Sequence, residues 1–179
     1  DGASLAGKAG YKTIAELSRE RIRRAEKAIA PEAPSGFRTF KLAKSSFAAW
    51  EASSDTEVCD LLTKIEAHSA HTESETDDDI LFELLLKDGF ELTTKVAEIS
   101  AAGGKVYSVA DGALLICLER NLTKEVIDAL ADLAEEKDTA RVVCLDAGFQ
   151  GNDQLKTNAV QTFKSRLGHG EDGSMFRTV

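Results

Sequence analysis

LLICLE (114–119) and RVVCLD (141–146) are the stretches of sequence that decide the fold. Each is a short apolar run that ends in a carboxylate, which is the pattern of a buried strand. Between them, Thr123 precedes a helical pattern in which apolar residues recur every three or four positions. Strand, helix and strand in this order predict a βαβ unit, whose two strands should lie parallel with a right-handed crossover.

Signals on both sides extend this unit. Lys105–Val109 is a β-prone run, and Asp111-Gly112 after it is typical of a hairpin turn leading into residues 114–118. The segment DILFELLLKDG (79–89) predicts a helix that Thr76 and Asp79 cap and that ends at a glycine. Together with the βαβ unit, these signals predict an α/β fold: a small mixed β-sheet with packed helices.

The two ends of this region carry weaker signals. A last helix is expected after residues 148–153, and FRTV (176–179) is a candidate edge strand. GFRTFKL (36–42) is predicted to be another short strand, and Ser54 with Glu57 forms a capping-box pattern ahead of a further helix. One face of the last helix should carry the following residues: Leu155, Ala159 and Phe163.

Three segments are predicted along the chain. Residues 1–10 are rich in glycine and alanine and should form a flexible lead-in. Residues 11–35 should form a basic connecting helix, because the helical pattern over 13–29 is followed by two prolines. Residues 36–179 should form a single α/β domain, a size at which a chain can bury a substantial core.

Composition narrows the class of protein. The chain has 179 residues, of which 42% are hydrophobic, and no apolar run approaches the roughly 20 residues that cross a bilayer. It has three cysteines, an odd number without a C-x-x-C pair. These features predict a cytoplasmic protein without a membrane association or a disulfide framework.

Charge is distributed unevenly along the chain. Residues 1–44 hold ten basic and five acidic residues, a net charge of +5. Residues 45–179 hold twelve basic and twenty-six acidic residues, a net charge of −14. The total of −9 argues against non-specific nucleic-acid binding by the whole surface, whereas the asymmetry indicates that the N-terminal part meets a different partner.

The basic helix offers one candidate contact. Arg19, Arg23 and Lys27 follow one another at intervals of four residues and form a single ridge. Neighbours on such a ridge have Cβ atoms about 6 Å apart, which is compatible with successive phosphates of DNA. The alternative is a solvated helix face, because three glutamates are interspersed with these residues: Glu16, Glu20 and Glu26.

Glu119 and Asp146 offer the other candidate site, because each ends one of the two parallel strands. Ligands of open α/β sheets bind outside these strand ends, where two acids could hold Mg²⁺ for phosphoryl chemistry. The alternative is structural, with Asp146 ordering the next loop and Asn152 capping the last helix. Cys117 and Cys144 occupy equivalent strand positions and should point to one face as small buried hydrophobes.

Other possible sites have simpler explanations. Residues 102–105 (AGGK) lack the spacing of a phosphate-binding loop and precede a strand, so a turn is expected there. His68 and His71 could share a metal on one helical face, but no cysteine or further histidine stands at matching spacing. The acids at 77–79 lack the alternating ligands of a calcium loop, and helix capping explains them.

Several segments resemble the modification subunits of type III restriction–modification systems. RVVCLDAGFQGNDQLKTNAVQTFK (141–164), with FRTV at the end, resembles their C-terminal signature. Three upstream segments resemble such proteins in the same order, and SRERIRRA (18–25) resembles the segment that enters this region. The three are GFRTFKL with the following SSF and W (36–50), LFELLLKDG (81–89) and VYSVADGALLICLE (106–119).

The resemblance implies a DNA methyltransferase as the parent protein. Such a subunit transfers a methyl group from S-adenosylmethionine to the N6 atom of adenine in a short DNA site. It also assembles with a helicase-nuclease restriction subunit, and a second modification subunit is a further possible partner. The resemblance therefore places DNA, the restriction subunit and S-adenosylmethionine with the parent protein, in a bacterial type of defence.

The motifs of methyl transfer are missing from this part of the sequence. The base-holding loop [D/N]-P-P-[Y/F/W] requires adjacent prolines, and the only two prolines here are Pro31 and Pro34. The segment Phe149–Asp153 departs from the cofactor-binding F-x-G-x-G pattern at its last position. We therefore expect no catalytic residue and no cofactor in this chain.

The leading hypothesis is an accessory C-terminal region that serves assembly or DNA contact. Candidate contacts are the basic ridge at 19, 23 and 27 and two large aromatic residues, Trp50 and Phe149, provided that the aromatics are exposed. A second hypothesis is a metal-dependent phosphoryl-transfer or hydrolase domain that uses Glu119 and Asp146. A third is a free-standing regulatory α/β protein.

Overall fold

The computed structural model describes residues 5–29, 32, 36–47, 76–167 and 176–179. The chain divides into two compact units, Asp1–Leu42 and Ala43–Val179. The boundary between the units lies after residue 42. The sequence predicts a domain that begins at residue 36, so residues 36–42 fall in the first unit. The second unit contains the sheet and is described first.

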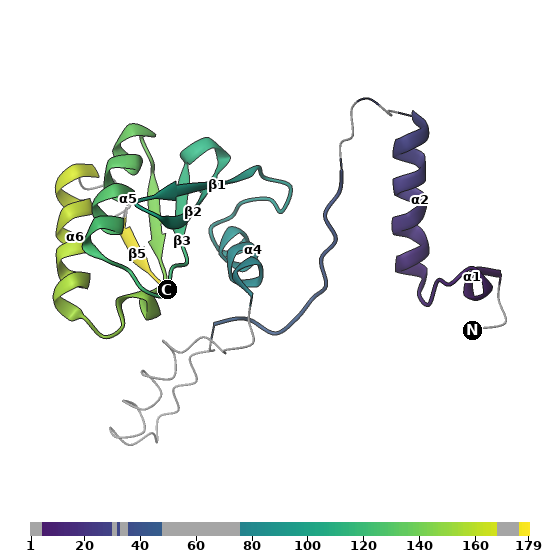
Figure 1. Cartoon of the computed structure of the whole chain (residues 1–179), viewed down its shortest axis with the longest axis horizontal. Coiled ribbons are helices and arrows are strands. Elements are labelled where there is room, and N and C mark those ends of the chain that lie inside the picture. The colour runs from purple at the N-terminus through teal and green to yellow at the C-terminus, as the bar shows by residue number, and fades with distance from the viewer. Residues whose placement is uncertain (1–4, 30–31, 33–35, 48–75, 168–175) are drawn as a thin grey trace, which may run out of the picture. The chain divides into compact units, whose positions relative to one another are not determined.

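The centre of the second unit is the predicted βαβ element. Strand β3 (Leu114–Cys117), helix α5 (Lys124–Glu136) and strand β4 (Arg141–Cys144) follow one another, and β3 pairs with β4 in parallel. Thr123 caps α5 by accepting a hydrogen bond from the Val126 N–H. The prediction of parallel strands joined by a helix is confirmed (Figure 1).

Three more strands complete a mixed sheet in the order β1-β2-β3-β4-β5. β1 (Val96–Ala101) and β2 (Gly104–Val109) form an antiparallel hairpin, and β2 is antiparallel to β3 as the Asp-Gly turn predicts. β5 (Phe176–Thr178) is the expected edge strand and lies parallel to β4. β1 was not predicted from the sequence, because its exposed residues weaken the apolar pattern.

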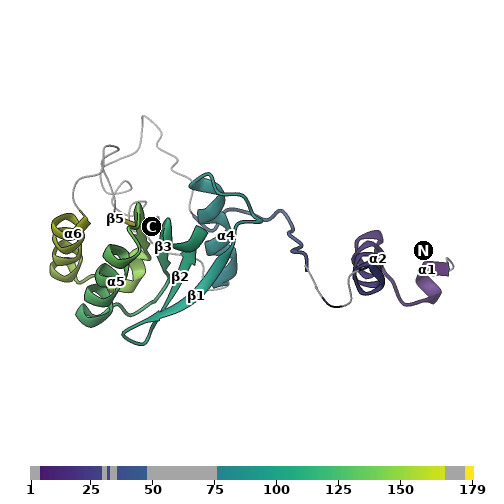
Figure 2. The ribbon, with the colours of Figure 1, turned by 90° about the horizontal axis from the view of Figure 1, so that it is seen from above.

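Helices cover both faces of the sheet (Figures 1 and 2). One face packs against α5 and α6 (Asp153–Leu167), and alternate strand residues such as Leu115 and Val142 enter that cluster. The opposite face packs against α4 (Asp77–Lys87), where Ile116 belongs to the buried cluster. The predicted face of α6 is confirmed, since Ala159 and Phe163 are buried and Leu155 packs against them.

Both ends of α4 carry the predicted signals. Thr76 and Asp79 form a reciprocal capping box at the N-terminus. At the C-terminus, Gly89 has φ +80°, and the Phe90 N–H donates to the Leu85 carbonyl at 2.8 Å. This closure satisfies carbonyls that the helix end leaves without partners.

Two polar contacts tie α4 to the rest of the unit. Arg141 at the start of β4 lies 2.6 Å from Asp88. Glu83 accepts hydrogen bonds from the Ser45 hydroxyl and from the Ser46 N–H, the latter at 2.6 Å. Residues 43–47 are therefore attached to α4.

The predicted strand over residues 36–42 is wrong. In the part of the chain that the structure describes, residues 36–45 belong to no helix or strand. Their alternating pattern is compatible with a strand, but a strand also needs a neighbour for its backbone groups. The predicted capping box at 54 and 57, Trp50 and the histidines at 68 and 71 lie outside the described residues.

The first unit contains the predicted basic helix, α2 (Ile14–Ile29). A four-residue helix, α1 (Leu5–Lys8), lies in the segment predicted as a lead-in. No residue of α2 is buried, and Ile14 and Ile29 are 84% and 83% exposed. In the described ranges, no helix is long and apolar enough to cross a membrane.

Two loops leave the carboxyl ends of β3 and β4 and are bonded to each other. The Leu122 N–H donates to the Gly148 carbonyl at 2.8 Å, and the Gln150 side chain donates to the Arg120 carbonyl at 3.1 Å. Gly148 is buried, and a Cβ atom there would lie 2.2 Å from the carbonyl oxygen of Glu119. The two loops approach this closely only because residue 148 has no side chain.

We expect Gly148→Ala to destabilise the second unit by about 3 kcal/mol, because a forced contact with backbone displaces one loop from the other. Urea unfolding followed by circular dichroism measures the change. Ala147→Ser is the control, since Ala147 is exposed in the same turn, and it should change stability by less than about 0.5 kcal/mol. Equal stability of the two variants would show that the close approach is unimportant.

Candidate functional site

The candidate site lies where the two loops leave β3 and β4, as the sequence predicts for a parallel pair. Glu119 follows β3, and its Oε1 accepts a hydrogen bond of 2.7 Å from the Lys105 N–H at the start of β2. The Glu119 carboxylate is thus held on the β2 side of β3. Because a backbone donor already binds this oxygen, Glu119 helps to close the end of the sheet.

Asp146 follows β4 and is held on the other side. Its N–H donates to the Val179 carbonyl at 2.7 Å, beyond the end of β5. Its Oδ1 is buried and forms an ion pair of 2.5 Å with Lys156 Nζ of α6, although the pair lacks normal hydrogen-bond geometry. The ion pair fixes a half-buried carboxylate between the loop and the last helix.

The two carboxylates therefore point to different partners. One is bound by β2 and the other by α6, on opposite sides of the β3–β4 pair. Within the part of the chain that the structure describes, no group of three or more potential metal ligands is found. The metal hypothesis thus depends on two acids that each already have a different protein partner.

The structural interpretation explains the loop after Asp146. A short 3₁₀ turn spans Asp146–Phe149, and Gln150 has left-handed backbone angles. Asn152 Oδ1 then accepts a hydrogen bond of 3.0 Å from the Leu155 N–H. Asn152 therefore caps α6, as expected.

A polar pocket of about 260 Å³ opens beside Glu119. Two acidic and two basic side chains line it, so their formal charges cancel. Arg120 lies 3.7 Å from Asp77 across this region. The lining residues are Asp77, Lys105, Tyr107, Leu118, Glu119 and Arg120.

Lys105 and Tyr107 form the part of this pocket nearest the sheet. The Lys105 ammonium lies 4.8 Å from the centre of the Tyr107 ring and 3.0 Å from Glu98. Interaction with the Tyr107 hydroxyl, and then with Glu98, raises the pKa of Lys105. The hydroxyl itself is buried and has no hydrogen-bond partner among the residues that the structure describes, so its effect on Lys105 is electrostatic. Because acidic and basic side chains both line the pocket, its charge favours neither an anionic nor a cationic ligand.

The sequence did not predict this pocket or the Lys156 ion pair. The hairpin register pairs Val106 with Cys117, which brings Lys105 beside the end of β3. The Asp-Gly turn could therefore have predicted that Lys105 lies close to Glu119, because it fixes the register of the hairpin. The ion pair depends on how α6 packs against the sheet, and no local pattern encodes that distance.

Two predictions about buried residues have different outcomes. Cys117 and Cys144 are buried on the α5–α6 face, as predicted. Phe149 is only 3% exposed and belongs to the same core, so the condition set for its role as a contact, exposure to solvent, is not met, and Phe149 is a core residue. The aromatic ring gains more from burial beneath the loop than from exposure to water.

The basic ridge of α2 is interspersed with acids, as the alternative interpretation states. Glu20 lies 4.0 Å from Arg23 and 2.8 Å from Arg24. Arg19 and Arg23 line an open hollow of about 550 Å³ together with acids and the extended segment after the helix. Lys27 is exposed beyond it. The other lining residues are Tyr11, Glu16, Glu20, Glu26, Gly36, Phe37 and Thr39.

Comparison with known proteins assigns no family. No protein-family model matches the chain, and no curated protein matches it.

We expect Mg²⁺ and Mn²⁺ to leave the melting temperature nearly unchanged, because Glu119 and Asp146 already have protein partners. An ion bound at a specific site would stabilise the fold by mass action. Differential scanning calorimetry over a metal titration is the measurement, with Asp146→Asn as the matched variant. A rise that saturates with metal and vanishes in Asp146→Asn would establish the metal-dependent hypothesis instead.

Proposed function

We propose that this chain is the C-terminal accessory region of the modification subunit of a type III restriction–modification system. In this proposal it serves assembly, and the S-adenosylmethionine and adenine sites lie elsewhere in the parent protein. The order of the family-like segments along the sequence supports the proposal. The observation that carries the assembly role is the uncovered apolar face of α2.

That face is apolar along the length of the helix. Ile14, Ile22 and Ile29 recur at intervals of seven or eight residues, and Ala25 lies between the last two. All four are exposed in the first unit. A helix of 16 residues is marginal without tertiary contacts, and an apolar stripe of this kind gains stability when another surface covers it.

The position of Arg21 indicates what covers the stripe. Arg21 lies four residues after Leu17 and four before Ala25, so it lies within the apolar face near the middle of α2. Self-pairing of two α2 helices about this midpoint would bring two guanidinium groups together. A different partner with a carboxylate opposite Arg21 avoids this repulsion. We therefore propose the restriction subunit as the occupant, in preference to a second modification subunit.

Contact with DNA is a second candidate function for the same helix. The net charge of +5 over residues 1–44 favours it. The ridge of Arg19, Arg23 and Lys27 is centred on the side of the helix opposite the middle of the apolar face, so one helix could serve both functions. The glutamates beside the ridge weaken its positive field.

Substitutions on the two faces of α2 separate these functions in the full-length subunit. The double substitution Ile22→Glu and Ile29→Glu should prevent formation of the complex with the restriction subunit, because it places two negative charges where the proposal has apolar contacts. The melting temperature of the second unit should not change, because α2 buries no residue. Light scattering of the mixed subunits measures the complex mass. An unchanged mass of the complex would contradict the docking proposal.

The control is Arg19→Gln with Arg23→Gln, which lowers the net charge by the same amount. It should leave the complex mass unchanged. If the ridge binds DNA, the affinity of the subunit for DNA should fall less steeply with salt, by about one unit of slope per lost phosphate contact. An unchanged slope would identify the ridge as a solvated face.

A further inference from the structure

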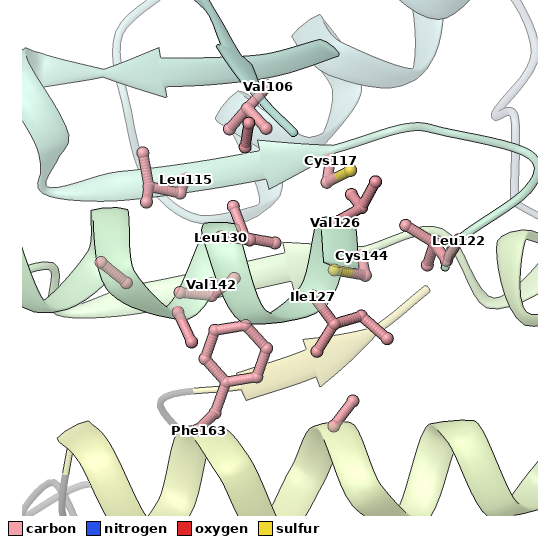
Figure 3. Packing of buried hydrophobic residues seen from close by; sticks show 14 of the residues in the cluster. Val106, Leu115, Cys117, Leu122, Val126, Ile127, Leu130, Val142, Cys144 and Phe163 are labelled. Atoms are coloured by element: carbon pink, nitrogen blue, oxygen red, sulfur yellow. The ribbon is translucent and has the colours of Figure 1, made fainter. Parts of the chain in front are cut away.

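Two thiols lie side by side in the core of the second unit. Cys117 of β3 and Cys144 of β4 are direct partners in the parallel register. Both are free and fully buried on the face that α5 covers. Figure 3 shows their sulfur atoms near Leu122, Val126 and Ile127.

The register places the two cysteines at a separation that a disulfide can bridge. Neighbouring strands lie about 4.8 Å apart. Disulfides join residues whose Cα atoms are roughly 4.4–6.8 Å apart. Both side chains point to the same face, so a bond requires no change of register. The Cβ atoms of parallel partners are further apart than the usual value of about 3.8 Å, so the bond would be strained and readily reduced.

The two thiols differ chemically. Interaction with the Cys144 thiol lowers the pKa of Cys117, although burial opposes this change. Interaction with Cys117, and then burial, raises the pKa of Cys144 well above its usual value. The thiolate is the reactive form of cysteine. Cys117 is therefore the better nucleophile of the pair.

We propose that Cys117 and Cys144 are an oxidation site that forms a reversible disulfide with peroxide. The Cys117 thiolate attacks one oxygen of hydrogen peroxide, the O–O bond breaks, and hydroxide leaves while Cys117 becomes a sulfenic acid. The sulfur of Cys144 then attacks the Cys117 sulfur and displaces the sulfenic oxygen as water, with loss of the Cys144 proton. Peroxide is the oxidant, and a small dithiol reverses the reaction.

The position of the pair gives the bond a structural consequence. Glu119 and Asp146 each follow their cysteine by two residues, so the disulfide would join the carboxyl ends of β3 and β4 directly below the two loops. A bond there draws the strands together and changes the spacing of the loops. This inference is independent of the proposed function, because it depends only on the sheet register and the core.

Burial controls the rate of the reaction. Cys117 and Cys144 are fully buried in the same core cluster as Leu122 and Val126, so peroxide reaches the thiols only when this part of the core opens locally (Figure 3). Oxidation should therefore be slow in buffer. It should accelerate several-fold in urea below the unfolding transition, where local opening becomes more frequent.

The first experiment uses the full chain with Cys59→Ser, so that only the two core thiols remain. After peroxide treatment in low urea, the intact mass should fall by two hydrogens, and alkylation after denaturation should label neither cysteine. A dithiol should restore both thiols. Two alkylated cysteines after the same treatment, or added oxygen without cross-linking, would overturn the proposal.

The second experiment tests the order of attack with alanine variants, which keep the core apolar. With Cys144→Ala in the same background, dimedone should trap a sulfenic acid on Cys117 after peroxide. With Cys117→Ala, trapping on Cys144 should be several-fold slower. Equal trapping in the two variants would contradict the assigned roles. If either variant fails to fold, the mass measurement on the two-thiol chain still decides whether the bond forms.

Discussion

The parallel pairing of β3 with β4 is the constraint on which the second unit depends. Both strands are short and almost entirely apolar, and their side chains alternate between two buried clusters. A parallel pair of this kind needs cover on both faces. α5 covers one face because it connects the two strands. α4 covers the other face with its four buried apolar residues, and a salt bridge between Asp88 and Arg141 links it to β4. The close approach of the two loops, and the placement of Glu119 and Asp146, follow from this arrangement.

Elements that carry their own signals could be predicted from the sequence. α4 has caps at both ends, α5 has an N-cap and an apolar face, and the Asp-Gly turn marks the β2–β3 hairpin. β1 was missed because half of a hairpin strand is exposed at the sheet edge, where Glu98 and Ser100 interrupt the apolar pattern. The segment at 36–42 had a suitable pattern, but in the described part of the chain it is not paired as a strand with any other strand. The partners of Asp146 and Glu119 could not be predicted, because they depend on tertiary distances and, for Glu119, on hairpin register.

The two units use apolar residues in opposite ways. In the second unit, helices bury their apolar faces against the sheet, and even Phe149 in a loop belongs to the core. In the first unit, α2 has an equally clear apolar face, and none of the residues of this helix is buried. The uneven charge of the sequence follows the same division. The second unit is acidic and has a buried core, whereas α2 is basic and exposes its apolar face. This difference leads us to propose assembly as the role of this region.

Hydrogen exchange followed by mass spectrometry tests this account most directly. In the isolated chain, amides of β3 and β4 should exchange slowest, and those of α2 should exchange rapidly, because only the strands are buried on both sides. Upon addition of the restriction subunit, α2 alone should gain strong protection. Protection of α2 equal to that of β3 in the isolated chain, or no gain in the assembled protein, would contradict the claim that its apolar face serves assembly.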